Sequence, residues 1–125
     1  MCRWTKNIRR FRLTHMVNPI RDYINVVDLA EAHGLALGYL KNGTSDVFNL
    51  GTGRGNSVLE IVEAVKKETG ADFAVGQTQP RLGEYAEMRA DNRKAKEILG
   101  WVPKRTIADS VKSLVTWYRL HPNGW

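Results

Sequence analysis

Residues 47–64 read VFNLGTGRGNSVLEIVEA. The run from Val47 to Leu50 predicts a short strand, and the glycine-rich turn at 51–55 leads from it into a helix. Ser57 begins that helix and Glu60 follows three residues later, which is the spacing of a capping box. The apolar residues of its inner face lie at helical spacing: Val58, Ile61, Val62 and Val65. A strand, a tight turn and an amphipathic helix in this order are typical of α/β folds.

The segment upstream repeats this order. Tyr23 to Val27 form a β-prone run, and we expect Asp28 to cap a helix that stops at Asn42-Gly43. Parallel strands are normally buried on both faces, so two or three short strands would leave an apolar edge in need of a partner.

The segment downstream continues it. Residues 73–75 predict a third strand, Asp91 is predicted to cap a helix closed by Gly100, and Thr106 begins the last helix with Asp109 in a second capping box. A chain of 125 residues is near the usual size of one domain. We therefore predict one α/β fold in which helices cover at least some parallel strands.

The net charge of +6 comes mainly from residues 1–18, which hold five basic residues and no acidic one. The rest of the chain is nearly neutral, so nucleic-acid binding by the folded part is not expected. We interpret residues 1–19 as a basic N-terminal arm outside the core. The alternative is a basic amphipathic helix that contacts an anionic surface or a partner.

Cysteine, histidine and hydropathy patterns exclude several kinds of site. Cys2 is the only cysteine, so an internal disulfide and a multi-cysteine zinc site are excluded, and the three histidines lack metal-ligand spacing. No apolar run approaches the roughly 18–20 residues that span a bilayer. These features predict a cytoplasmic protein with no metal site and no membrane contact.

Catalytic motifs are missing from these residues. The turn at 51–55 lacks the glycine spacing of a dinucleotide-binding fingerprint, although the N-terminus of the helix after it could face an anion. No tyrosine has a lysine four residues later, and no Ser-His-Asp or Cys-His arrangement is evident. We therefore predict no catalytic residue. Arg21 and Arg81 lie at element boundaries, and a guanidinium suits a phosphate or pyrophosphate.

Four blocks carry a family resemblance: RDYINVVDLAEAH (21–33), residues 47–64, PRLGEYAEMRADNRKAKEILGW (80–101) and HPNGW (121–125). Together they resemble the C-terminal part of UDP-glucose 4-epimerases, which are extended short-chain dehydrogenases/reductases. The resemblance covers residues 20–125. It implies an incomplete Rossmann-type sheet together with the small substrate-binding lobe of that family.

The resemblance also implies a site for the UDP part of a UDP-sugar. It assigns the phosphates to Arg21, with Asp22 and Tyr23 beside it, and to Arg81. It further assigns the ribose to Glu84 and the uracil pocket to Val58. The chain departs from the family at 80–84, where two adjacent arginines and an Asp are usual and this chain has Arg81 alone and Glu84. It also departs at Asn25, where His is usual.

The activity implied is that of an isomerase that interconverts UDP-glucose and UDP-galactose in galactose metabolism, with NAD as its cofactor. Because the NAD-binding glycine motif and the catalytic Tyr-Lys pair are missing, we expect this chain alone to be inactive and to bind no NAD. Its expected partners are a UDP-sugar and either the N-terminal Rossmann half or a second copy of itself. Alternatives are a non-catalytic, self-associating or nucleotide-sugar-binding module, and a fragment of another nucleotide-sugar dehydratase or decarboxylase.

Overall fold

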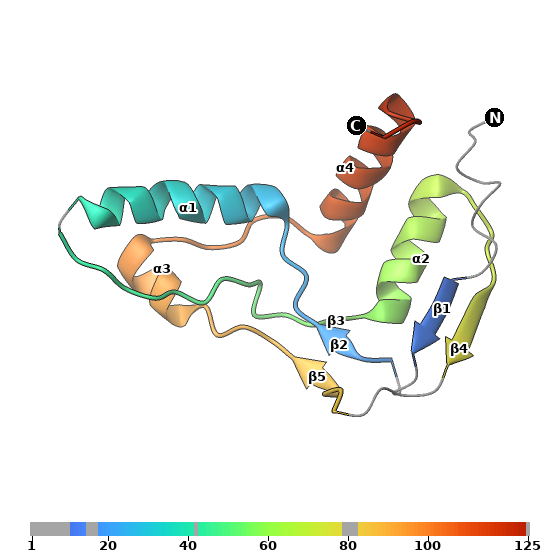
Figure 1. Ribbon diagram of the computed structural model, residues 1–125, viewed down its shortest axis with the longest axis horizontal. Coiled ribbons are helices and arrows are strands. Elements are labelled where there is room, and N and C mark those ends of the chain that lie inside the picture. The colour runs from blue at the N-terminus through green and yellow to red at the C-terminus, as the bar shows by residue number, and fades with distance from the viewer. Residues whose placement is uncertain (1–10, 15–17, 42, 79–82, 125) are drawn as a thin grey trace.

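The computed structural model describes residues 11–14, 18–41, 43–78 and 83–124 (Figure 1). The elements within these ranges follow in chain order: β1 (Phe11–Thr14), β2 (Ile20–Arg21), α1 (Val26–Leu40), β3 (Asn56–Ser57), α2 (Val58–Thr69), β4 (Val75–Thr78), β5 (Glu87–Met88), α3 (Arg93–Leu99) and α4 (Ile107–Leu120).

The strands form two small sheets. In the first, β1 pairs with β4 in parallel. In the second, β2 lies in the centre, antiparallel to β3 and parallel to β5, with Ile20 opposite both Ser57 and Glu87. The prediction of an α/β fold with short, partly parallel sheets is confirmed.

Helices α2 and α4 begin where their capping boxes predict. The Ser57 hydroxyl accepts from the Glu60 N–H while the Glu60 carboxylate accepts from the Ser57 N–H, and Thr106 and Asp109 form the same pair of bonds. Helix α2 ends at Gly70, whose φ of 67° is the left-handed conformation that glycine adopts without strain. These local signals were sufficient to define both helices.

The predicted start of α1 is wrong. The helix begins at Val26, and its N-cap is Asn25, whose side-chain oxygen accepts from the Val27 N–H at 2.9 Å. Asn caps a helix as well as Asp does, and the Asn25 amide also donates to the Ser110 hydroxyl of α4 at 2.8 Å. The predicted strand over 23–27 is therefore displaced to β2, and Asp28 is a buried residue inside the helix.

Three other details of the secondary structure also differ from the sequence prediction. Residues 47–50 form no strand, β4 begins at Val75 rather than at residue 73, and the N-cap of α3 is Asn92 rather than Asp91. The two-residue strand β5 was not predicted. A strand exists only where a partner strand bonds to it, and that pairing depends on residues distant in the sequence.

The N-terminal arm contributes one strand to the fold. Phe11–Thr14 pair with Val75–Thr78, so the alternative of an amphipathic helix is wrong for these four residues. Residues 1–10 and 15–17 lie outside the described part of the chain. The domain boundary after residue 19 stays a prediction.

The buried apolar core lies between α1 and α3. Ala32, Ala95 and Trp101 are buried, and four partly buried side chains pack against them: Ile24, Phe48, Leu50 and Leu99. Helices α2 and α4 pack against each other at the other end of the molecule (Figure 1).

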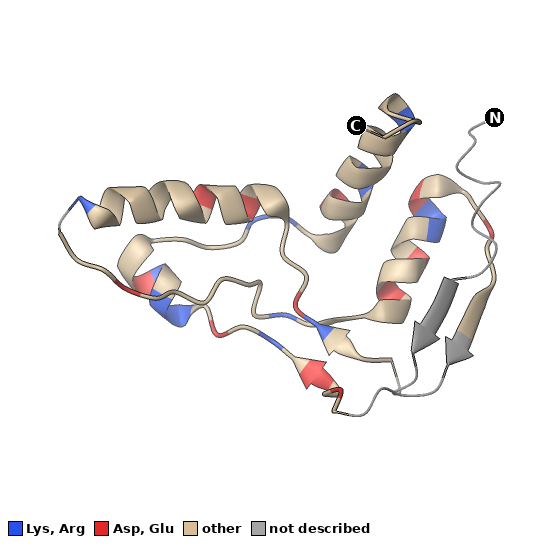
Figure 2. Ribbon diagram, in the orientation of Figure 1, with Lys and Arg blue, Asp and Glu red and all other residues tan. Residues whose placement is uncertain are grey.

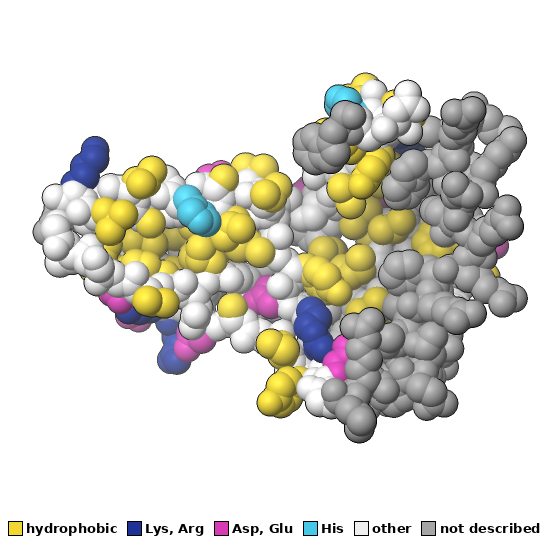
Figure 3. Space-filling model, viewed as in Figure 1, with side chains coloured by type: hydrophobic (Ala, Val, Ile, Leu, Met, Phe, Trp, Pro, Cys, Tyr) yellow, Lys and Arg dark blue, Asp and Glu magenta, His cyan; other side chains and the backbone are white. Residues whose placement is uncertain are grey.

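Helix α1 is apolar around most of its circumference. Its charged residues, Asp28 and Glu31, lie near its start (Figure 2). Five large apolar side chains of this helix are exposed: Val26, Val27, Leu35, Leu37 and Leu40. Apolar side chains are visible along this part of the surface in Figure 3. A helix that is apolar all round is normally buried on more than one side, so this surface has the character of an interface.

No helix among the described residues is long and apolar enough to cross a membrane.

Candidate functional site

The residues that the sequence nominated gather around the three-stranded sheet. Arg21 is the last residue of β2, Asp22 and Tyr23 follow it, and Val58 begins α2 directly after β3. Glu84 lies just before β5. Charged residues of both signs mark β2, β5 and the adjoining loops (Figure 2). Arg81 lies outside the described residues.

Asp22 connects three segments of the chain. Its carboxylate accepts hydrogen bonds from the backbone N–H of Thr52 at 2.8 Å, of Gly53 at 2.9 Å and of Ala90 at 3.1 Å. The Thr52 hydroxyl also donates to it, at 2.5 Å. Partial burial raises the pKa of Asp22, but the hydrogen bonds from Thr52, Ala90 and Gly53 together outweigh it and lower the pKa below its ordinary value.

The glycine turn is packed tightly against this carboxylate. Gly51 is buried, and a Cβ atom at this position would lie 2.6 Å from the Asp22 Oδ2 and 2.5 Å from the Ala90 Cβ. A Cβ on Gly55 would lie 2.1 Å from the Ile20 Cγ2. The Asn92 amide donates to the Gly51 carbonyl oxygen at 2.8 Å. The turn therefore needs glycine for close approach at two positions.

Arg21 and Glu84 form an ion pair across 63 residues of sequence. The guanidinium Nη2 donates to the Glu84 Oε1 at 3.4 Å, and Nη1 donates to the Ile20 carbonyl oxygen at 2.8 Å. The side chains are 27% and 20% exposed, so a ligand can reach both. The second Glu84 oxygen, Oε2, is buried and accepts no hydrogen bond from the described residues. Within the described ranges, Oε2 is thus an acceptor without a donor, and it lies in a side chain paired with a partly exposed cation.

The N-terminus of α2 is not available to an anion. Besides the two bonds of its capping box, the Val58 N–H donates to the Pro19 carbonyl at 3.3 Å and the Leu59 N–H to the Asn18 side-chain oxygen at 3.0 Å. The expectation that this helix end could face a ligand is therefore wrong. Val58 itself and Tyr23 are half-buried beside the sheet.

The same observations test whether the glycine turn fits the pyrophosphate of NAD. A dinucleotide site needs free N–H groups at the helix start and space over the glycines. Here the N–H groups are bonded internally, and Asp22 and Ala90 fill the space over Gly51. The turn at 51–55 does not fit a dinucleotide.

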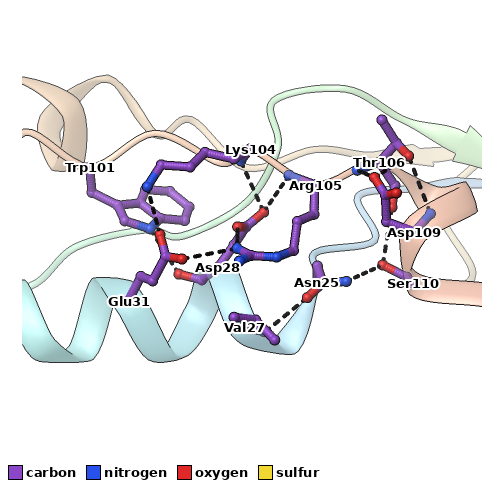
Figure 4. Close-up of polar contacts among 10 residues, drawn as sticks. All are labelled: Asn25, Val27, Asp28, Glu31, Trp101, Lys104, Arg105, Thr106, Asp109 and Ser110. Atoms are coloured by element: carbon purple, nitrogen blue, oxygen red, sulfur yellow. Dashed lines mark hydrogen bonds and ion pairs between the residues drawn. The ribbon is translucent and has the colours of Figure 1, made fainter. Parts of the chain in front are cut away.

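A second polar cluster, which sequence analysis missed, joins α1 to the segment before α4 (Figure 4). Asp28 is 0% exposed, and its carboxylate accepts from the backbone N–H of Lys104 at 3.0 Å, from that of Arg105 at 2.9 Å and from the Arg105 guanidinium. Arg105 and Lys104 also pair with Glu31. The buried indole N–H of Trp101 donates to the Asp28 carbonyl oxygen at 2.9 Å. We call these five residues the Asp28 clasp.

The clasp is a structural cluster. Burial raises the pKa of Asp28, but the hydrogen bonds from Arg105 and Lys104 outweigh this effect and lower it. Asp28 is completely buried, so a ligand cannot reach its carboxylate. The available signal was an acidic residue on the inner, apolar face of α1, because a carboxylate there needs a cation from elsewhere in the chain. Sequence analysis instead interpreted Asp28 as a helix cap.

The described residues contain no group of three or more His, Cys, Asp or Glu side chains that could hold a metal ion.

Known proteins resemble this chain in sequence. No protein-family model matches it. Residues of this chain are 44% identical over 108 positions to a UDP-glucose 4-epimerase of Lactobacillus helveticus, and 41% identical over 107 positions to UDP-arabinose 4-epimerase 1 of Arabidopsis thaliana. Both matches include 85% of this chain. They include 33% and 26% of the relatives, so the chain spans a quarter to a third of their length.

Solved structures resemble it as well. A UDP-glucose 4-epimerase of Stenotrophomonas maltophila, with bound NAD and formylated UDP-arabinopyranose, superposes with a TM-score of 0.82 at 34% identity. The match covers 90% of this chain and 35% of that one. An epimerase of Bifidobacterium longum in complex with NAD⁺ and UDP superposes with a TM-score of 0.74 at 38% identity, over 86% of this chain and 32% of that one. In sequence and in structure, this chain thus resembles the C-terminal portion of a UDP-glucose 4-epimerase, an enzyme of the extended short-chain dehydrogenase/reductase family.

Proposed function

We propose that this chain is the UDP-sugar-binding portion of a 4-epimerase and that it holds the nucleotide at the edge of the β3-β2-β5 sheet. In this proposal Arg21 and Arg81 bind the phosphates, Glu84 the ribose, and Val58 and Tyr23 line the site. The observation that carries it is the ion pair of Arg21 and Glu84, two partly exposed side chains of opposite charge, in a chain that resembles epimerases solved with UDP and UDP-glucose.

The chemistry of the pair suits a nucleoside diphosphate. A guanidinium donates two parallel hydrogen bonds to phosphate oxygens, and charge-assisted bonds of this kind are among the strongest that proteins make. The Glu84 side chain is 20% exposed, and its carboxylate can accept a hydrogen bond from a sugar hydroxyl. The carboxylate of Asp22 already accepts four hydrogen bonds from within the chain, so in this proposal it does not contact the nucleotide itself.

The parent enzyme moves a hydride between the sugar and NAD, and the chain presents no described group for that step. The glycine turn does not fit a dinucleotide, and the sequence contains no Tyr-Lys pair. We therefore propose that this chain alone is inactive, and that NAD and the catalytic residues belong to the rest of a cytoplasmic epimerase of galactose metabolism.

The exposed apolar face of α1 supports a protein partner. Helix α1 carries five exposed large apolar side chains, and this chain matches only 33% and 26% of the two sequence relatives. We propose the N-terminal Rossmann half of an epimerase as the partner, with a second copy of this chain as the alternative.

Light scattering tests the alternative. A monomer at the highest soluble concentration excludes self-association. Co-expression with the preceding part of the L. helveticus epimerase tests the first partner: UDP-galactose turnover is expected from the mixture and from neither piece alone. In the mixture, the exposed-face substitution Leu37→Asp is expected to abolish turnover, while Ser113→Asp on α4 serves as the control.

Titration with UDP tests the binding site. In ¹⁵N-labelled chain, UDP is expected to shift the signals of Arg21 and of residues 51–58 in a saturable way, and equimolar inorganic pyrophosphate to shift them less. Arg21→Ala is expected to weaken UDP binding about tenfold, the value of one charged hydrogen bond. Arg93→Ala, which removes an arginine of α3 that pairs with Asp91, is the matched control and should leave binding unchanged. Equal losses in the two variants contradict the proposed site.

A further inference from the structure

Asp22 accepts hydrogen bonds from two segments that lead to proposed ligand contacts, and it directly follows a third contact, Arg21. The residue before it is Arg21, the turn that it binds through Thr52 and Gly53 leads into Val58, and the strand before Ala90 connects back to Glu84. These segments are 30 to 68 residues apart in the sequence. The backbone hydrogen bonds of the β3-β2-β5 sheet do not by themselves join the glycine turn to Ala90, which lies two residues after β5.

The carboxylate has no capacity left for a ligand. Oδ1 accepts from the N–H and the hydroxyl of Thr52, and Oδ2 accepts from the N–H groups of Gly53 and Ala90. Each oxygen therefore has two donors, which is the number that its lone pairs accept. Gly51 packs directly against the Asp22 carboxylate, so closely that a methyl group on Gly51 would overlap Oδ2.

We infer that Asp22 is a positioning residue, one that fixes Arg21, the glycine turn and the chain after β5 relative to one another and does not touch the nucleotide. This inference deepens the proposed function and rests on it for the identity of the ligand. It differs from the assignment of Asp22 to the UDP contacts, because in a contact role at least one of the four internal bonds must open when UDP binds.

Hydrogen exchange tests the structural part without any ligand. In Asp22→Asn the amide group replaces one acceptor by a donor that faces N–H groups. Exchange of the Thr52, Gly53 and Ala90 amides is expected to rise about tenfold or more. Asp109→Asn is the matched control, because its carboxylate also accepts from a threonine N–H and the same threonine hydroxyl, but at the start of α4. Unchanged exchange at the three amides in Asp22→Asn overturns the inference.

UDP titration of the same variants tests the consequence for binding. Asp22→Asn is expected to weaken UDP about tenfold, and Asp109→Asn to leave it within about twofold even where it lowers the melting temperature. Equal weakening in both variants assigns the effect to general stability and overturns the positioning role. In the wild-type chain the three amides should stay protected when UDP is bound. Faster exchange there on adding UDP means that the carboxylate leaves them for the ligand, which also overturns it.

The two arms separate this inference from the proposed function. Absence of UDP binding by the wild-type chain contradicts the UDP site, whereas the exchange rates still decide whether Asp22 holds the three segments. Asp22→Glu adds a further check, since a longer carboxylate could still reach a ligand but would move its oxygens away from the N–H groups of Thr52, Gly53 and Ala90. Recovery of full UDP affinity in this variant contradicts positioning.

Discussion

Asp22 and Asp28 lie six positions apart, and their carboxylates are satisfied by different kinds of hydrogen-bond donor. Both carboxylates accept backbone N–H groups from segments far away in the sequence. Asp28 is completely buried and is neutralised by the Arg105 guanidinium, whereas Asp22 is held only by N–H and hydroxyl donors. Arg21, the arginine next to Asp22, pairs instead with Glu84 and stays 27% exposed. In the clasp the cation is used for stability, and in the candidate site a cation remains accessible to an anion.

Breaking the clasp should have the largest effect. Asp28→Asn leaves the Arg105 guanidinium beside Glu31 alone and removes a fully buried charge partner. We expect the free energy of unfolding to fall by about 3 kcal/mol, because the N–H groups of Lys104 and Arg105 lose a charged acceptor and the new amide group is buried facing them. Urea denaturation followed by circular dichroism measures this. The double variant Asp28→Asn with Arg105→Met should recover part of the loss, and no recovery would argue against a paired role.

Gly51→Ala should have the next largest effect on stability, and it should disturb the region around Asp22 rather than the Asp28 clasp. The new methyl group overlaps Asp22 and Ala90, so we expect a loss of about 2 kcal/mol in stability together with loss of UDP binding. Gly38→Ala on α1 is the control, because nothing lies within 4 Å of a Cβ there and alanine favours a helix. Retained UDP affinity in Gly51→Ala would show that the turn is not part of the site.

Acid should weaken both centres. The pKa values of Asp22 and Asp28 lie below their ordinary value of 3.8 in the folded chain. Each carboxylate therefore contributes stability that is complete above the ordinary pKa and is lost as the pH falls through the lowered one. Unfolding measured from about pH 5 downward should show falling stability below about pH 4, and Asp22→Asn and Asp28→Asn should each flatten that dependence. A dependence as steep as in the wild type contradicts the assignment for that residue.

The smallest effect should come from the outer edge of the clasp. Lys104 and Glu31 pair at 2.9 Å, but both side chains are substantially exposed. Water screens such pairs, so Lys104→Met should change the folding equilibrium by no more than about twofold. Thermal denaturation at low and at high salt measures this change in stability. An effect as large as that of Asp28→Asn would mean that the whole clasp acts as one unit.

The sequence predicted the helices whose signals are local. The capping boxes at Ser57 and Thr106 and the closing Gly70 each lie within a few residues of what they define, and α2 and α4 were predicted correctly. The strands were displaced because pairing between β2, β3 and β5 is decided over long distances in the chain. For the same reason, neither the 77-residue connection from Asp28 to Arg105 nor the internal bonds of Asp22 could be found from spacing.

The assignment of residues to a UDP site stays a prediction. The resemblance assigned Arg21, Glu84 and Val58 to one site, and the structure brings Arg21 and Glu84 into contact. It could not assign the Arg21–Glu84 ion pair or the occupied N-terminus of α2, because both depend on which neighbours supply donors and acceptors. Spacing identifies residue types, while packing decides which of their hydrogen-bonding atoms remain available.

The indole of Trp101 gives the chain a built-in optical probe. It is 2% exposed, and its N–H is bonded to the Asp28 carbonyl of α1. When α1 separates from the segment before α4, this ring enters water and its emission moves to longer wavelength. With Trp4, Trp117 and Trp125 replaced by phenylalanine, fluorescence of the single remaining tryptophan would report detachment of that helix separately from unfolding of the rest.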